Sequence, residues 1–523
     1  MRHEGIVSKL SLWQKCALLS GGTAFGTRAV ASVGLPALQF ADGPHGLRHQ
    51  DEGSNHMGLG ESLPATCFPT AVTLADTWDT ELVRRVGAAL GREAASQRVG
   101  VLLGPGINIK RSPLCGRNFE YFSEDPCLAG EMAAAYVAGV QSAGVGACVK
   151  HFAVNSQETR RQASDSELDE RTLREIYLSA FERCVRKARP AAIMSSYNRV
   201  NGTYANENEH LLAEILRGEW GFSGAVVTDW GASNDHVAGV RAGSTLEMPA
   251  CGLDSARELE RAVEAGVLDE AVVDARVDEL VELVLSTREA VEEAPGYDEL
   301  EHHQLAREAA AAGIVLLKNE APAGGEPLLP LAPGTSVALV GDFAANPRYQ
   351  GAGSSLVNCT QLDTLEGAIS MSGLRLVGFE PGFDRAGATS DDSLAAAEVL
   401  ASRADVVLCC LGLSEAAESE GLDRGSLALD EGQLALLACV AKANANVVVL
   451  LSSGGVVECD WEDQARAILY QGLGGQAGAM AALDVLLGRT NPSGRLAETW
   501  PRRLEDVPCA DGFPADGAVA AYR

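Results

Sequence analysis

A repeating pattern between about residue 30 and residue 285 is the feature that most constrains the fold of this chain. In each repeat, a short apolar run ends in polar residues or glycines, and a stretch of helical periodicity follows it. The runs and their polar ends occupy residues 38–46, 101–106, 147–151, 191–198 and 225–231. Strands that alternate with helices form βα units around a parallel sheet. So many units within roughly 250 residues predict a (β/α) TIM-like barrel, closed or nearly closed, with an active site at the C-terminal ends of its strands.

An acidic stretch that contains proline and glycine, residues 292–300, divides the chain and is typical of a linker. Beyond it, strand-like runs at 337–341, 406–410 and 447–451 are spaced more widely, which favours a doubly wound sheet. The sequence therefore predicts an α/β protein in which an N-terminal (β/α) barrel is followed by an α/β sandwich domain. The predicted boundaries are a barrel over 1–287, a linker over 288–304, a sandwich domain over 305–505 and a C-terminal tail over 506–523.

The charge balance and the cysteines narrow the partners that this chain can have. Lysine and arginine total 42 against 71 aspartate and glutamate, a net charge of −29. Such a surface repels nucleic acid and anionic membranes, because both need basic patches. The 13 cysteines include no C-x-x-C pair, so we expect no metal and reduced thiols. No apolar run approaches about 18 residues and no signal-peptide pattern follows Met1, so we expect a cytoplasmic protein. Homo-oligomerisation stays open.

A glycine-rich loop at residues 472–477 matches the dinucleotide pattern G-x-G-x-x-A after the strand-like run 467–470. That pattern belongs on the first βα turn of its unit, with an acidic residue about 20 positions further on at a strand end. Here the loop lies on the last βα turn, and the next acidic residue, Asp484, falls inside the following helix. Tight strand-to-helix packing explains the glycines more simply. We therefore expect no cofactor, and keep a nucleotide-dependent oxidoreductase as an alternative that rests on this loop alone.

Charged and hydrogen-bonding residues gather at the predicted strand ends of the first domain. Asp229 ends the run 225–227, with the competing interpretation that it caps the next helix. The other residues at or just after strand ends are Asp42, Arg48, Arg117, Lys150, His151, Arg161 and Tyr197. Cations favour an ionised Asp229, many hydrogen-bonding groups suit a ligand covered in hydroxyls, and Trp230 offers an apolar face to a sugar. The pattern predicts glycoside hydrolysis by two carboxyl groups.

That chemistry needs a second carboxyl group to act with Asp229. The loop that follows the run 406–410 offers Glu415, Glu418 and Glu420. An acidic loop is also the usual composition of a solvated surface, so the residue types alone leave open which of these glutamates, if any, is catalytic.

A set of sequence motifs covers nearly the whole chain in a recognisable order. In the first domain the motifs occupy residues 42–48, 64–70, 116–126, 150–155, 194–198 and 227–230. In the second domain they are Glu-Gly-Leu-Asp-Arg at 420–424 and Asn-Pro-Ser-Gly-Arg-Leu at 491–496. On these motifs the chain resembles glycoside hydrolase family 3, the β-glucosidase and β-xylosidase family. The resemblance implies a barrel and an α/β sandwich with the active site at their junction.

The resemblance also implies roles for individual residues. By motif position Asp229 would be the nucleophile and Glu420 the acid/base residue, with Glu418 as its main competitor. The residues implied to bind the substrate are Asp42, Arg48, Arg117, Lys150, His151, Arg161, Met194, Tyr197 and Trp230. The two catalytic carboxyl groups should lie about 5–5.5 Å apart, as a retaining mechanism requires. Because loops rich in Glu, Ser and Gly are often mobile, we expect Glu420 to lie partly out of position without ligand.

The implied activity is that of a retaining exo-acting β-glycosidase, which releases a non-reducing terminal sugar through a covalent glycosyl-Asp229 intermediate. β-Glucosidase is favoured, with a small carbohydrate or glycoside as substrate, while β-xylosidase, α-arabinofuranosidase and β-galactosidase stay open. A catalytically silent carbohydrate-binding protein is the alternative of a different class. Many members continue into a fibronectin-like third domain, which we expect this chain to lack because it stops at Arg523.

Overall fold

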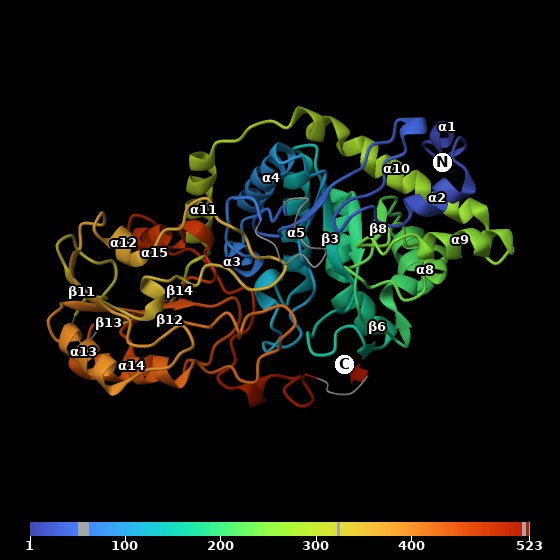
Figure 1. The fold of residues 1–523 in the computed structure, drawn as a ribbon. Helices are drawn as coiled ribbons and strands as arrows, with labels where there is room; N and C mark the ends of the chain where they lie inside the picture. The colour runs from blue at the N-terminus through green and yellow to red at the C-terminus, as the bar shows by residue number, and fades with distance from the viewer. Residues whose placement is uncertain (51–61, 322–324, 515–518, 522–523) are drawn as a thin grey trace.

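The chain forms two α/β units that lie side by side, joined over the top by α10 and α11 (Figure 1). The computed structural model describes residues 1–50, 62–321, 325–514 and 519–521. The first unit, blue to green, extends from the N-terminus to α10, and the second, yellow to red, begins at α11. Within the part of the chain that is described, no helix is long and apolar enough to cross a membrane.

A parallel sheet in the order β1-β2-β3-β5-β8 forms the wall of the first unit. Its strands are β1 (Phe40–Asp42), β2 (Val101–Leu103), β3 (Gly146–Phe152), β5 (Ala192–Ser195) and β8 (Ala225–Val227). β2, β3, β5 and β8 are buried along their whole length. Burial on both faces is the reason why these strands read as unbroken apolar runs in the sequence.

Single β-bridges rather than further long strands close this sheet into a barrel. Val227 of β8 pairs with Leu246, and the adjacent Glu247 pairs with Ser20. On the other side Gly26 pairs with Gln39, the residue before β1. The barrel is therefore closed, but single bridges replace strands over part of its circumference, which agrees with the predicted closed or nearly closed barrel.

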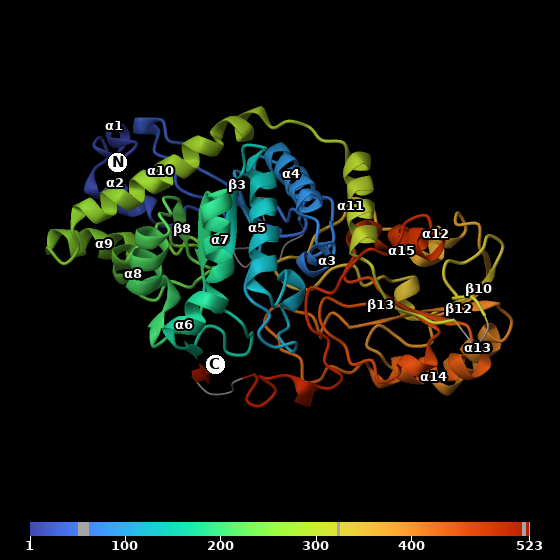
Figure 2. The ribbon, with the colours of Figure 1, turned by 180° about the vertical axis from the view of Figure 1, so that it is seen from behind.

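Helices surround the barrel, as the view from behind shows (Figure 2). The α-helices among them are α1 (Glu4–Val7), α2 (Leu12–Leu18), α3 (Ala71–Asp76), α4 (Thr80–Ser96), α5 (Pro126–Gln141), α6 (Glu170–Thr172), α7 (Ser179–Ala188), α8 (His236–Ala242), α9 (Asp254–Glu264) and α10 (Glu270–Glu293), and a π-helix, His210–Glu219, lies between β5 and β8. Glycines allow α4 and α5 to pack closely: a Cβ on Gly87 would lie 2.4 Å from the Tyr136 carbonyl oxygen, and one on Gly139 would lie 2.2 Å from that of Arg84.

The second unit is a six-stranded sheet in the order β11-β10-β12-β13-β14-β9, parallel except for β9. Its strands are β9 (Val315–Asn319), β10 (Ser336–Val340), β11 (Arg375–Glu380), β12 (Val406–Gly412), β13 (Val447–Ser452) and β14 (Ala467–Tyr470). Its helices are α11 (Glu299–Gly313), α12 (Leu365–Ile369), α13 (Asp391–Ala401), α14 (Glu431–Ala443) and α15 (Gly478–Leu486). α12 and α15 cover one face, and α13 and α14 cover the other (Figure 1). The predicted architecture, a (β/α) barrel followed by an α/β sandwich, is confirmed.

Two predicted segments contain more regular structure than expected. Within 288–304, α10 continues to Glu293 and α11 begins at Glu299, so only five residues, 294–298, are not helical. Asp298 caps α11, because its side chain accepts hydrogen bonds from the backbone N–H groups of Leu300 and Glu301. The acidic residues of this stretch therefore begin a helix and do not form an extended linker. The tail also contains a strand, β15 (Val519–Ala521), that pairs with β4 (Asp165–Glu167) beside the barrel.

Candidate active site

Asp229 lies at the C-terminal mouth of the barrel, two residues after the end of β8. Thr228 fastens the strand end, because its hydroxyl donates to the Met248 carbonyl at 3.0 Å and accepts from the Met248 N–H at 2.8 Å. The following helix, α8, is capped by Asp235, so the alternative that Asp229 is a helix cap is wrong. The side chain of Asp229 is left to point into the mouth of the barrel.

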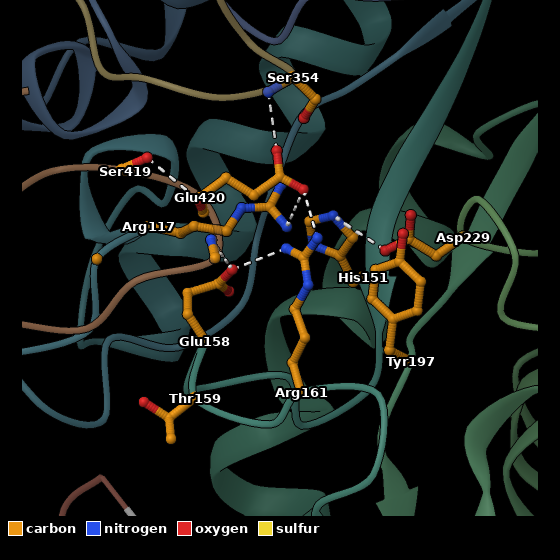
Figure 3. Close-up of polar contacts among 12 residues, drawn as sticks. Arg117, His151, Glu158, Thr159, Arg161, Tyr197, Asp229, Ser354, Ser419 and Glu420 are labelled. Carbon is orange, nitrogen blue, oxygen red and sulfur yellow. Dashed lines mark hydrogen bonds and ion pairs between the residues drawn. The ribbon is translucent and has the colours of Figure 1, made fainter. Parts of the chain in front are cut away.

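The two oxygens of Asp229 have different surroundings. Oδ1 accepts the Trp230 N–H at 2.8 Å. Oδ2 is buried, has no hydrogen-bond partner among the described residues, and faces Nε2 of His151 at 3.8 Å (Figure 3). Burial raises the pKa of Asp229, although the positive charges of Arg117 and Arg161 oppose the shift. Burial outweighs these charges, because the whole residue is only 7% exposed, and the ionised state of Asp229 at neutral pH stays a prediction.

A buried ion-pair network underlies this mouth and contains a carboxylate that the sequence interpretation missed. Glu120 accepts a hydrogen bond from Nη2 of Arg117 at 2.6 Å and forms an ion pair with Nζ of Lys150 at 2.9 Å, and all three residues are at most 2% exposed. Burial alone would raise the pKa of Glu120, but the two cations outweigh it and lower the pKa. The spacing of Glu120 three residues after Arg117 was the available signal.

Asp42 and His151 complete the barrel side of the cluster. Removal from bulk water raises the pKa of Asp42 to about 6, against the charge of Lys150. The backbone N–H of Arg48 donates to the Asp42 carbonyl at 2.8 Å, and Nη1 of Arg48 donates to the carbonyl of Gly353 in the second domain at 3.3 Å. Burial, reinforced by nearby arginine and lysine charges, lowers the pKa of His151, so His151 is a neutral imidazole at the pH of the cell.

The remaining predicted substrate residues take different positions. Tyr197 donates its hydroxyl to the Trp230 carbonyl at 3.0 Å, and the guanidinium of Arg161 lies 4.7 Å from the centre of its ring. Trp230 donates Nε1–H to the Ala24 carbonyl at 2.8 Å and packs against Phe25. Met194 is 2% exposed and belongs to the apolar interior of the barrel, opposite Val227 of β8.

Glu420 reaches this cluster from the second domain. Arg161 Nη2 contacts its Oε1 at 2.8 Å, Arg117 Nη1 lies 3.8 Å from the same oxygen, and the Ser354 N–H donates to Oε2 at 2.8 Å (Figure 3). Burial alone would raise the pKa of Glu420, but the charges of Arg117 and Arg161 hold it well below its usual range. Its two oxygens are held by different domains, Oε1 by Arg161 of the barrel and Oε2 by the Ser354 N–H of the second domain, and the expectation that Glu420 lies partly out of position relative to Asp229 stays a prediction.

The other two glutamates of the same loop face away from the barrel cations. Glu418 is 3% exposed, accepts Nη2 of Arg348 at 3.2 Å, and accepts the Gly454 N–H. Glu415 pairs with Arg348 and Arg385 of its own domain. Of the three candidates, only Glu420 is therefore in contact with the cations around Asp229.

The glycine-rich loop at 472–477 packs against the barrel. A Cβ on Gly472 would lie 2.1 Å from Oγ1 of Thr73, and one on Gly475 would lie 2.5 Å from the Cys67 carbonyl oxygen. Gln476 accepts the Cys67 N–H at 3.0 Å. The glycines serve close packing, as predicted, but between the two domains rather than between a strand and its helix.

Two family profiles match the chain. The glycosyl hydrolase family 3 N-terminal domain matches residues 48–286, and the glycosyl hydrolase family 3 C-terminal domain matches residues 314–521. These matches cover most of both α/β units and include Asp229 and Glu420. The fold and the site define the chain as a glycoside hydrolase.

Individual relatives support the same assignment. The chain is 46% identical over 522 residues to the thermostable beta-glucosidase B of Acetivibrio thermocellus, covering 99% of this chain and 68% of that protein. It is 43% identical over 533 residues to an exo-alpha-(1->6)-L-arabinopyranosidase of Bifidobacterium longum, covering 99% and 70%. The crystal structure of a Bifidobacterium adolescentis GH3 beta-glucosidase has a TM-score of 0.93 at 42% identity, covering 99% and 74%. This chain belongs to glycoside hydrolase family 3.

Proposed function

We propose that this enzyme is a retaining, exo-acting β-glucosidase. The single observation that carries the proposal is the convergence of Asp229 and Glu420, from two domains, on one cluster of cations. Oδ2 of Asp229, which has no hydrogen-bond partner in the described part of the chain, is available to attack an anomeric carbon. The similarity to the Acetivibrio beta-glucosidase favours glucose as the sugar that is released.

The proposed reaction has two steps. In the first, Asp229 forms an ester with the anomeric carbon while Glu420 gives a proton to the departing glycosidic oxygen. In the second, Glu420 takes a proton from water, the resulting hydroxide displaces Asp229, and the sugar leaves with its original anomeric configuration. His151, being neutral, adds no charge near Asp229.

The low pKa of Glu420 fits the second step directly, because a carboxylate is the base that this step requires. For the first step, Glu420 has to be protonated. Arg161 pairs with Glu420 and is also a predicted sugar-binding residue. A sugar hydroxyl that accepts a hydrogen bond from Arg161 would weaken this pair and raise the pKa of Glu420, so substrate binding would itself prepare the acid form.

Trapping with a 2-deoxy-2-fluoro-glucoside, followed by peptide mapping, tests the nucleophile, because such compounds accumulate the covalent intermediate of a retaining enzyme. We expect the label on Asp229 and none on an Asp229→Ala variant. A label on another carboxylate would refute the assignment of Asp229. Nuclear magnetic resonance of the first product anomer tests retention separately.

The similarity to arabinopyranosidases gives a second candidate substrate. A panel of nitrophenyl glycosides separates the candidates: β-glucoside, β-xyloside, β-galactoside, α-L-arabinofuranoside and α-L-arabinopyranoside. We expect the highest kcat/KM with the β-glucoside. A higher value with the arabinopyranoside would replace glucose as the preferred sugar and leave the roles of Asp229 and Glu420 unchanged.

We also propose a cytoplasmic location. All 13 cysteines are free thiols, which is usual for a reducing compartment. Cell fractionation followed by immunodetection tests this, and recovery of the protein outside the cytoplasmic fraction would contradict it.

A further inference from the structure

The backbone of the loop that carries Glu420 touches the backbone of the barrel at Gly116. A Cβ on Gly116 would lie 1.7 Å from the Leu422 carbonyl oxygen and 2.6 Å from that of Ser419. Only glycine permits this approach. The loop between β12 and α14 is therefore seated on the other domain, and contacts across the domain boundary decide where Glu420 lies.

Asp423, three residues after Glu420, binds barrel backbone with both of its carboxylate oxygens. The N–H of Glu158 lies 3.0 Å from Oδ2 and 3.1 Å from Oδ1, and the N–H of Thr159 donates to Oδ2 at 2.8 Å. The N–H of Gly116 donates to Oδ1 at 3.3 Å. A side chain of the second domain thus accepts three backbone N–H groups of the first, and hydrogen bonds to an ionised acceptor are among the stronger ones.

Glu158 makes the reverse contact, from the barrel to the second domain. Its Oε2 accepts the N–H of Gly421, the residue next to Glu420, at 2.8 Å. The same oxygen accepts Nη1 of Arg161 at 2.7 Å, while Nη2 of Arg161 holds Glu420 at 2.8 Å (Figure 3). Glu158 is 3% exposed, so these bonds are shielded from water.

We propose that Asp423 and Glu158 are positioning residues, which together fix the Glu420 carboxyl over the sugar. We call this pair of contacts the reciprocal clasp. The proposal rests on the proposed role of Glu420 as acid/base residue. Neither Asp423 nor Glu158 contacts Asp229 in the structure, so the clasp acts through Glu420. A displacement of about 1 Å at a reacting group can cost roughly a hundredfold in rate, which makes such a clasp necessary where a catalytic group comes from another domain.

The test is a series of glucosides with different leaving groups, measured with an Asp423→Asn variant. The variant keeps the size of the side chain but turns one acceptor oxygen into an NH2 group that faces backbone donors. A methyl glucoside needs full proton donation, whereas a dinitrophenyl glucoside needs almost none. We expect kcat/KM to fall by roughly 10- to 100-fold for the methyl glucoside and by only about 2-fold for the dinitrophenyl glucoside.

Glu158→Gln tests the other half of the clasp. If Asp423→Asn does not fold, the same series of glucosides is measured with Glu158→Gln alone. In the double variant, kcat/KM should fall by less than the product of the two single-variant factors. Both substitutions disturb the same placement of Glu420, so the second one adds little to the first. A matched control is Asp384→Asn. Asp384 also accepts two backbone N–H groups, those of Ala386 and Ala388, but entirely within the second domain. We expect this control to match the wild type with every glucoside.

The outcomes separate the clasp from the proposed function. Glu420→Gln should show the same dependence on the leaving group, only more strongly. If Glu420→Gln shows no such dependence, the acid/base role fails and the clasp fails with it. If Glu420→Gln shows it but Asp423→Asn and Glu158→Gln lower kcat/KM equally for all glucosides, the proposed function stands and the clasp is refuted.

Discussion

The two halves of the active site are held by different kinds of contact. On the barrel side, the closest ion pairs form within one domain: Glu120 pairs with Arg117 and Lys150, and all three residues are almost fully buried. On the second-domain side, the Glu420 carboxylate is held by Arg161 from the barrel and by the backbone N–H of Ser354. The barrel half is therefore complete once the barrel has folded, whereas the other half depends on docking of the second domain.

The nucleophile and the acid/base residue should therefore respond differently to the same disturbance. Asp229 follows a strand, and backbone pairing determines its position. Glu420 lies on a loop whose place is set across a domain boundary. Changes in the barrel should therefore alter stability or abolish all activity, and changes at the boundary should alter proton donation.

Asp229→Ala should lower the activity more than any other substitution considered. Removal of the nucleophile should lower kcat by roughly 10⁴-fold or more for every glycoside, including those with good leaving groups, because the covalent step is lost. Stopped assays with dinitrophenyl glucoside measure this. Azide should restore turnover and yield a glycosyl azide of inverted configuration. Comparable turnover of variant and wild type would mean that the nucleophile lies elsewhere.

Glu120→Gln should have its main effect on stability. Removing one partner from a buried ion pair leaves an uncompensated charge, which costs about 3–5 kcal/mol. Arg117 and Lys150 would both lose their carboxylate. Urea unfolding followed by tryptophan fluorescence measures the loss. Glu81→Gln is the control, because Glu81 forms an exposed pair with Arg84, and it should leave the midpoint unchanged. Equal midpoints for the two variants would contradict a structural role of the barrel network.

The strand ends could be predicted from the sequence because the barrel repeats a local pattern. An apolar run that ends in a charged residue marks the mouth of a parallel barrel, and this placed Lys150, His151 and Asp229 correctly. The linker was predicted too long, since the acidic residues around Asp298 begin a helix and do not form a coil.

The part of the site that the second domain contributes could not be predicted in the same way. It lies on a loop, and a loop has no repeating pattern of apolar and polar residues that would show which side chains face the barrel. Glu418 and Glu420 are two residues apart, and only the fold shows that one faces Arg348 and the other Arg161. Glu158 and Asp423 were missed for a related reason. Their partners are backbone N–H groups of the other domain. Almost every residue has such a group, so residue types do not reveal these contacts.

Gly116→Ala should disturb the contact between the barrel and the loop that carries Glu420 without removing a charged group. The new Cβ would overlap the Leu422 carbonyl oxygen, so the loop has to move away from the barrel. We expect kcat/KM for methyl glucoside to fall by roughly 10- to 50-fold, as for a displaced catalytic group. Gly478→Ala is the matched control: it opens α15, a Cβ there meets no atom within 4 Å, and it should leave activity unchanged. A fall of the same size with all leaving groups would show that the barrel half is disturbed as well.

A pH dependence of sugar binding is the weakest of these effects, and it comes from Asp42 on the barrel side of the site. The pKa of Asp42 is raised to about 6 in the folded protein, above its usual value near 3.9. By itself this shift stabilises the unliganded fold at acid pH, and the contribution is lost as the pH rises through about 6. Sugar hydroxyls need the carboxylate as an acceptor, so binding changes in the opposite direction.

Glucose affinity, measured by calorimetry, should therefore increase by about tenfold between roughly pH 5 and pH 7, the increase expected when one carboxyl group with a pKa near 6 has to be ionised. Asp42→Asn should bind more weakly and lose this dependence, because its amide does not titrate. Asp423→Asn should keep the dependence, since Asp423 acts at the domain boundary and Asp42 at the end of β1. Loss of the pH dependence in Asp423→Asn would mean that sugar binding and loop docking are coupled, and the separation of the two halves would fail.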